Sequence, residues 1–99
     1  MTLHIINKPP QSHSALDDCL TTCSNGSTIL FIEDGVYALA QMSKEQKNVI
    51  SSRHIQISAL EADCLARGLS HLASNEFPIV NDDHFVQLVI EHPNSVSWS

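Results

Sequence analysis

Three cysteines are the side chains best suited to chemistry in this chain, and two of them, Cys19 and Cys23, lie four residues apart. On a helix this spacing places both on one face with Cα atoms about 6 Å apart, unlike a redox CxxC motif. Free cysteine is often buried, so packing is the favoured interpretation for Cys23 and Cys64. Cys19 lies nearer the edge of the apolar face and close to the expected helix N-terminus, where the helix dipole lowers a thiol pKa. Cys19 is therefore the candidate reactive thiol, although Asp17 and Asp18 oppose that shift.

A carboxylate pair, Glu33 and Asp34, forms a second candidate site where an apolar stretch ends before Gly35. Paired carboxylates can act as general acid and base. Side chains of this type also form turns and cap the helix that follows, and capping is the favoured interpretation. Nothing in the sequence supplies the nucleophile and oriented base of a hydrolase.

Metal and phosphate sites are not expected. The six histidines show no close pair at metal-ligand spacing, and no CxxC accompanies them. They are His4, His13, His54, His71, His84 and His92. The three glycines are isolated, so no glycine-rich loop is available to cradle a phosphate. We therefore expect neither a metal nor a cofactor.

The elements that would position these side chains alternate between strands and helices. Strands are expected at 2–6, at about 28–32, around Ile55 and Ile57, and at 77–80. Helices are expected from about 15 to 23, at 36–42, at 60–67 and from about 81 to 92. This alternation implies right-handed crossovers and a mostly parallel sheet between two helical layers. The predicted fold class is therefore α/β, a three-layer α/β/α domain with four to five strands.

Local signals indicate where several of these elements begin and end. Lys8-Pro9-Pro10 breaks the first strand, because proline fixes φ and removes a hydrogen-bond donor. Ser12 or Ser14 can cap the first helix, and Asn25-Gly26 can end it. The continuously apolar stretch 29–32 is typical of a parallel strand covered on both faces. The stretch 43–52 is undecided.

The second half of the chain carries similar signals. Gly68 ends the helix at 60–67. Pro78 suggests an edge position or the start of a strand. Asn81 or Asp82 can cap the last helix, and Pro93 ends it.

Length and composition predict one domain at 1–99 whose apolar surface partly needs a partner. The hydrophobic content of 42% excludes a disordered chain. No apolar run approaches the roughly 18 residues of a membrane span. The first residues show no basic leader with an apolar stretch and cleavage site, so a cytoplasmic location is expected.

The charge distribution disfavours direct binding to nucleic acid. The net charge is −6, and the five basic residues are scattered along the chain. Phosphate recognition needs clustered cations. The odd number of cysteines at these spacings favours reduced thiols in a cytosolic protein over a disulfide framework.

Several short segments, in their order and spacing over nearly the whole chain, resemble the DsrH/TusB family. They are Leu3-His4 with Asn7-Lys8-Pro9-Pro10, Glu33-Asp34-Gly35-Val36, Asp63 with Leu65-Ala66-Arg67-Gly68, Phe85-Val86, and Trp98. The resemblance implies a DsrEFH-like α/β/α domain. It also implies assembly with TusC/DsrF-like and TusD/DsrE-like subunits into a hetero-hexamer with two copies of each.

The function that this resemblance implies is sulfur relay. In TusBCD-type complexes, sulfur passes from a cysteine desulfurase through a TusA-like carrier to a TusD cysteine. It then passes through a TusE-like carrier to the enzyme that 2-thiolates the tRNA wobble uridine. DsrEFH-type complexes serve sulfur oxidation, and Cys19 falls where DsrH-type members carry a cysteine.

The resemblance and the residues together lead to one expectation and two alternatives. We expect a non-catalytic or auxiliary, mainly architectural subunit of the tRNA-thiolation relay, with Cys19 as its candidate persulfide carrier. One alternative is a DsrH-type subunit in sulfur oxidation. The other is a stand-alone thiol enzyme that uses Cys19.

Overall fold

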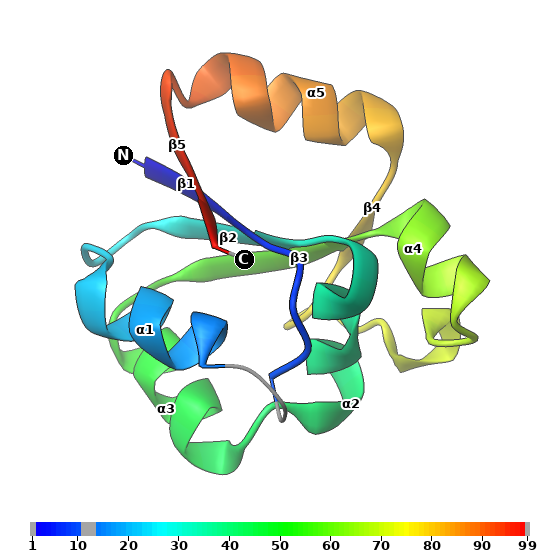
Figure 1. Ribbon diagram of the computed structural model, residues 1–99, viewed down its shortest axis with the longest axis horizontal. Coiled ribbons are helices and arrows are strands. Elements are labelled where there is room, and N and C mark those ends of the chain that lie inside the picture. The colour runs from blue at the N-terminus through cyan, green and yellow to red at the C-terminus, as the bar shows by residue number, and fades with distance from the viewer. Residues whose placement is uncertain (1, 11–13, 99) are drawn as a thin grey trace.

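A five-stranded sheet organises the computed structural model, which describes residues 2–10 and 14–98 (Figure 1). Its strand order is β4-β3-β2-β1-β5, and every neighbouring pair is parallel. The strands are β1 (Thr2–Ile6), β2 (Thr28–Phe31), β3 (Gln56–Leu60), β4 (Ile79–Val80) and β5 (Asn94–Trp98). The predicted α/β class with a parallel sheet is confirmed.

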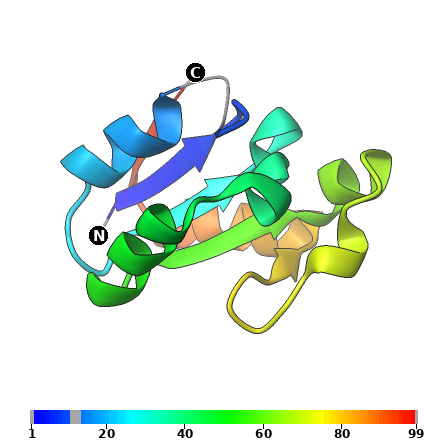
Figure 2. The same cartoon turned by 90° about the horizontal axis from the view of Figure 1, so that it is seen from below.

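Helices cover both faces of this sheet. One face carries α1 (Ala15–Thr22), α2 (Ala38–Gln41) and α3 (Lys44–Ser52), and the opposite face carries α5 (Asp82–Glu91) (Figures 1 and 2). At the side of the sheet, α4 (Glu61–Ala66) packs beside the 3-10 helix η1 (Glu33–Tyr37). A second 3-10 helix, η2 (Ser70–Leu72), follows α4. The three-layer arrangement is therefore confirmed.

The main core lies between the sheet and the layer of α1, α2 and α3. Parallel register brings Ile6, Phe31 and Ala59 side by side across β1, β2 and β3. These side chains are fully buried together with Leu16 and Cys19 of α1. All four residues of β2 are buried, as its continuous apolar sequence predicts.

Several predicted boundaries are confirmed. Asn81 caps α5, because its Oδ1 accepts a hydrogen bond from the His84 N–H at 2.9 Å. Gly68, with φ of +68°, follows the last residues of α4, a conformation that glycine adopts without strain. Strand β4 lies at the edge of the sheet, as Pro78 suggested, but it contains only Ile79 and Val80.

The end of α1 differs from the prediction. Cys23 is the C-cap residue, and Asn25-Gly26 lies in the turn that follows. The reason is Arg53, whose guanidinium donates hydrogen bonds to the carbonyls of Leu20 and Cys23. Arg53, which is distant in sequence, thus donates to the helix-end carbonyls that the glycine C-cap was expected to satisfy.

The start of α1 is only partly as expected. Ser14 is the N-cap residue, but its hydroxyl donates to Asp18 Oδ2 at 3.0 Å and accepts no backbone N–H. The alternative cap, Ser12, lies outside the described residues.

Three other segments differ from the sequence-based expectation. The stretch predicted as a helix at 36–42 is η1 followed by α2. The undecided stretch 43–52 contains α3, which begins at a capping box formed by Ser43 and Gln46. Strand β5 carries no strand pattern in its sequence, because Asn94–Trp98 is mostly polar and its side chains, apart from that of Trp98, are exposed. Within the described residues, no helix is long and apolar enough to cross a membrane.

Candidate functional site

The candidate thiol, Cys19, lies on the inner face of α1. Its side chain is 0% exposed, and that of Cys23 is 5% exposed. The helical spacing predicted from the sequence therefore places both cysteines toward the core. Cys64, in α4, is likewise buried, and all three thiols are free. The packing interpretation of Cys23 and Cys64 agrees with this burial.

The pKa of Cys19 is shifted upward, opposite to the direction expected from the helix dipole. Burial raises the pKa of the Cys19 thiol to about 12, and the neighbouring Cys23 adds to the rise, while Arg53 opposes it. Cys19 lies beyond the first turn of α1, where the dipole is weak. In this conformation Cys19 is a neutral thiol at neutral pH, and nucleophilic attack requires the thiolate.

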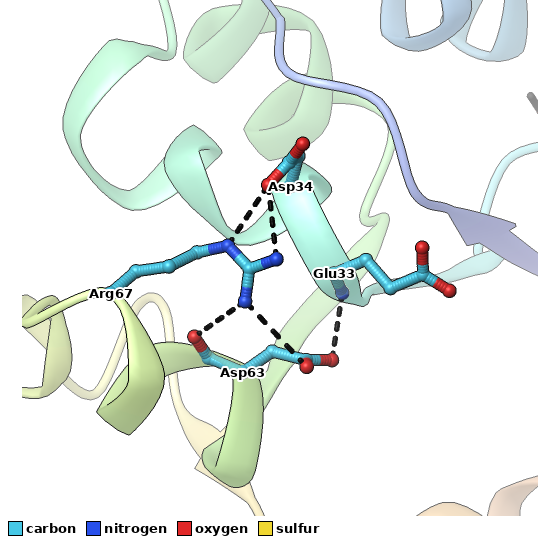
Figure 3. A network of polar contacts seen from close by, with 4 residues as sticks. All are labelled: Glu33, Asp34, Asp63 and Arg67. Atoms are coloured by element: carbon cyan, nitrogen blue, oxygen red, sulfur yellow. Dashed lines mark hydrogen bonds and ion pairs between the residues drawn. The ribbon is translucent and has the colours of Figure 1, made fainter.

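A polar network joins η1 to α4 at the carboxyl ends of β2 and β3 (Figure 3). The guanidinium of Arg67 contacts Asp34 Oδ1 through Nε and Nη2, both at 3.0 Å. Its Nη1 donates to the Asp63 carbonyl at 3.1 Å and lies 3.7 Å from Asp63 Oδ1. The other oxygen of that carboxylate, Oδ2, accepts from the Glu33 N–H at 2.7 Å. We call these four residues, Glu33, Asp34, Asp63 and Arg67, the η1–α4 clasp.

The η1–α4 clasp holds a tightly constrained turn. Glu33 has φ of +50°, a conformation that non-glycine residues rarely adopt. Two residues later, Gly35 lies against the end of β1 so closely that a Cβ atom would stand 2.2 Å from the Ile6 carbonyl oxygen. The residue type at position 35 is therefore dictated by the close approach of two backbone segments.

The carboxylates of Glu33 and Asp34 do not form a paired site. Their side chains point in different directions, and Asp34 is occupied by Arg67 (Figure 3). The favoured expectation, capping by these side chains, is also wrong, because the N–H at the start of η1 is bound by Asp63. No local pattern predicts this role of Asp63 or the pairing of Arg67 with Asp34, since the partners lie about thirty residues apart.

One buried histidine, His4, has a side-chain partner. His4 is 5% exposed, and its Nδ1 accepts a hydrogen bond from Trp98 Nε1 at 3.0 Å. Burial lowers the pKa of His4, which favours the neutral ring that can accept this bond. Within residues 2–10 and 14–98, no three histidine, cysteine or acidic side chains are grouped so as to hold a metal ion, and His13 lies outside these ranges.

An open hollow of about 570 Å³ lies between α1 and α3. Its lining includes Asp17, Leu20, Gln46 and Val49, and Gln46 Nε2 donates to Asp17 Oδ1 at 2.7 Å. Cys19 does not line it. The candidate thiol and this hollow are therefore separate features of α1.

Comparison with known proteins identifies relatives over nearly the full length. The family model described as "DsrH like protein" matches residues 8–95. Protein TusB of Pectobacterium carotovorum is 30% identical over 96 residues, which cover 97% of this chain and 99% of that protein. Protein TusB of Escherichia coli K12 is 30% identical over 98 residues, with the same coverage. The crystal structure of the YchN protein from E. coli superimposes with a TM-score of 0.75 over 98% of this chain and 97% of that chain, and its 11% identity makes this a likeness of fold alone.

Proposed function

This chain belongs to the DsrH/TusB family, and we propose that it is a subunit of a TusBCD-type sulfur-relay complex that supports 2-thiolation of the tRNA wobble uridine. The observation that carries the proposal is the similarity to TusB proteins over almost the whole of both chains. In this proposal residues 1–99 act as one domain in the cytoplasm. The domain assembles with TusC/DsrF-like and TusD/DsrE-like subunits, with two copies of each chain in the complex. A TusA-like carrier brings sulfur to this complex, and a TusE-like carrier receives sulfur from it.

The proposed role within that complex is architectural. A sulfur carrier must present its thiolate to a partner protein, whereas Cys19 is buried and burial raises its pKa to about 12. In the η1–α4 clasp the side chains of Asp34, Asp63 and Arg67 are engaged in contacts within the clasp, and the clasp contains no thiol that could carry sulfur. Both observations favour a subunit that supports the relay thiol of another chain.

Contact with tRNA is proposed to pass through other proteins of the relay. Two of the five basic side chains are held within the fold, Arg53 by carbonyls at the end of α1 and Arg67 by Asp34. Lys44 and Lys47 belong to α3, and Lys8 follows β1. With two of the five cations engaged in this way and a net charge of −6, affinity for a phosphate backbone is disfavoured.

The second candidate function is a DsrH-type subunit in sulfur oxidation, with Cys19 as a persulfide carrier. This candidate is favoured by Cys19 in α1, because DsrH-type members carry a cysteine in their first helix. Carriage at Cys19 would require α1 to move away from the sheet, because the thiol is fully buried. A stand-alone thiol enzyme would also need α1 to move and expose Cys19, but no partner protein would stabilise the exposed conformation.

The test uses a strain that lacks the chromosomal gene and carries either the wild-type or the Cys19→Ser protein. We expect Cys19→Ser to leave wobble 2-thiouridine almost unchanged. It should cost about 1–3 kcal/mol of stability, because the new hydroxyl lies fully buried in the core. Cys23→Ser is the matched control, because it changes a neighbouring buried thiol of the same helix. Mass spectrometry of tRNA nucleosides measures thiolation.

Two outcomes would contradict the proposal. Loss of 2-thiouridine in the Cys19→Ser strain alone, with the complex still assembled, would make Cys19 a carrier. Normal 2-thiouridine in the strain without any copy of the gene would remove the chain from tRNA thiolation. Intact-mass measurement of each subunit after sulfur loading would then show whether this chain gains a sulfur atom.

A further inference from the structure

The hydrophobic residues of α5 cover a wider arc of the helix than the side that faces the sheet. Five of the six residues from Phe85 to Ile90 are hydrophobic, and Gln87 is the exception. Phe85 and Leu88 are half-buried on the side of the sheet, where Leu88 lines a hollow together with Thr28 of β2 and Ser58 of β3. No residue of α5 is fully buried. The helix therefore has more apolar surface than its contact with the sheet covers.

The uncovered part forms one stripe on the outward side of α5. Val86, Val89 and Ile90 have exposed fractions of 56%, 42% and 69%. Their spacing of three and four residues places them next to one another along the helix. We call Val86, Val89 and Ile90 the α5 stripe.

Helix α1 provides a comparison, because only one of its sides is covered. In α1 the residues Ala15, Leu16, Cys19 and Leu20 are buried, and the exposed positions are Asp17, Asp18, Thr21 and Thr22. That division is typical of a helix with one face in water. In α5, by contrast, three hydrophobic residues lie exposed outside the side that faces the sheet. The sequence of α5 therefore fits a helix covered by a second surface.

The charges around the α5 stripe indicate what kind of surface covers it. Asp82 and Asp83 precede Val86 by four and three residues, so they continue the stripe at its N-terminal end. Glu91 lies along one side, where it accepts a hydrogen bond from Gln87 at 3.0 Å. Between Asp82 and Glu91, all of which the structure describes, there is no lysine or arginine.

These carboxylates argue against a second copy of the chain. In a parallel pair of α5 helices, Asp82 and Asp83 of the two copies would face each other. In an antiparallel pair they would approach Glu91 of the other copy. Like charges brought together at an interface disfavour that partner, whereas opposite charges favour association.

We propose that the α5 stripe is the docking surface for a different protein subunit, one that presents an apolar patch bordered by lysine or arginine. The inference rests on the proposed function for the identity of the probe, which is the pair of TusC-like and TusD-like subunits. It names the surface of this chain that would enter the complex.

The test is co-purification of tagged protein with both co-expressed subunits. Ile90→Asp places a charge at the most exposed position of the α5 stripe, and Leu65→Asp is the matched control, since Leu65 of α4 is 64% exposed outside the stripe. Both variants should fold, as judged by circular dichroism. Ile90→Asp should reduce the bound subunits by about tenfold or more, as substitution at the centre of an interface does, and Leu65→Asp should not.

A second variant tests the charge complementarity. Asp82→Asn with Asp83→Asn should weaken binding and make it less sensitive to salt, because the opposing basic side chains lose their partners. Unchanged or tighter binding by this double variant would contradict the proposal that lysine or arginine borders the partner's apolar patch.

The outcomes separate the two proposals. If the wild-type chain and Ile90→Asp bind the subunits equally, the α5 stripe is not the docking surface, and the proposed function stands. If the isolated wild-type chain forms a dimer that Ile90→Asp dissociates, the stripe binds a second copy and the inference is wrong. If the wild-type chain binds neither subunit, the proposed function and the partner named here both fail.

Discussion

His4 and Trp98, near opposite ends of the sequence, are joined by a hydrogen bond whose strength depends on pH. The hydrogen bond from Trp98 Nε1 to His4 Nδ1 joins β5 to β1 and needs a neutral histidine ring. Because burial lowers the pKa of His4 in the folded state, the unfolded chain binds more protons as the pH falls below 6.5. The contribution of neutral His4 to stability is therefore present above its unfolded pKa of 6.5 and is lost as the pH falls through the folded pKa.

We expect the midpoint of thermal unfolding to fall when the pH is lowered from 7.5 to 5. The fluorescence of Trp98, the single tryptophan, should report release of its indole in the same pH range. Replacement of His4 by Gln keeps an acceptor and removes the titrating ring, so this part of the pH dependence should disappear. Replacement of the exposed His71 by Gln is the control, and an equal effect of both changes would argue against His4 as the origin.

Gly35 is the residue whose identity the backbone constrains most tightly. An added Cβ would meet the Ile6 carbonyl oxygen at 2.2 Å, and backbone atoms there cannot move without disturbing β1. We expect Gly35→Ala to lower the free energy of unfolding by about 3 kcal/mol or more, a value typical of severe steric conflict. Urea-induced unfolding measures this loss.

Gly68 provides the comparison for Gly35. It has open space around the position of a Cβ, but its φ is +68°. Gly68→Ala should therefore cost only about 1 kcal/mol, from backbone strain alone. Equal losses for the two substitutions would mean that the close approach at Gly35 is relieved by a shift of η1.

At the scale of elements, the ends of α1 and α3 are tied together by one side chain. Arg53 follows the last residue of α3 and donates to the carbonyls of Leu20 and Cys23 and, at 2.8 Å, to Asn25 Oδ1. Arg53→Met keeps much of the aliphatic stem and removes every donor. We expect a loss of about 2 kcal/mol, because hydrogen bonds from a charged group contribute more than neutral ones.

The control for Arg53 is Lys47→Met on the exposed side of α3. This change removes a cation of the same helix without a described contact to α1, and stability should change little. Hydrogen exchange should show faster opening of the last turn of α1 only in the Arg53 variant. Protection of that turn in both variants would show that Arg53 does not hold it.

The elements also show which parts of the fold can be predicted from sequence. Strand β2 is signalled by its continuous apolar residues, and α5 by Asn81 and Pro93. Strand β5 cannot be predicted in this way, because its sequence is polar. It is held in place by pairing with β1 and by the hydrogen bond of Trp98. Pairing of that kind is a property of the tertiary structure and leaves no local pattern.

The candidate site was predictable in position but not in chemistry. Helical spacing placed Cys19 and Cys23 on the face that is buried. The pKa of Cys19 depends on the sheet that covers the helix, and that burial outweighs the dipole considered from the sequence. The η1–α4 clasp could not be anticipated, because the ion pair of Asp34 and Arg67 joins residues 33 positions apart.

The whole molecule is unevenly built around its sheet. The layer of α1, α2 and α3 encloses the main core, while α5 on the opposite face has no fully buried residue (Figure 1). Apolar side chains remain exposed on that face, and the acidic side chains around them disfavour contact between copies of the chain. Such an arrangement is typical of a subunit that is completed by a different protein.

The position of β1 between β2 and β5 has a consequence for the synthesis of the protein. The bond between Trp98 and His4 spans 94 positions, so β1 emerges from the ribosome long before its second neighbour exists. Until residues 94–98 have been translated, the apolar strand that contains Leu3, Ile5 and Ile6 keeps one unpaired edge. Unpaired edges of this kind recruit other strands, so a chain whose translation stalls before Asn94 is exposed to aggregation that the finished sheet avoids.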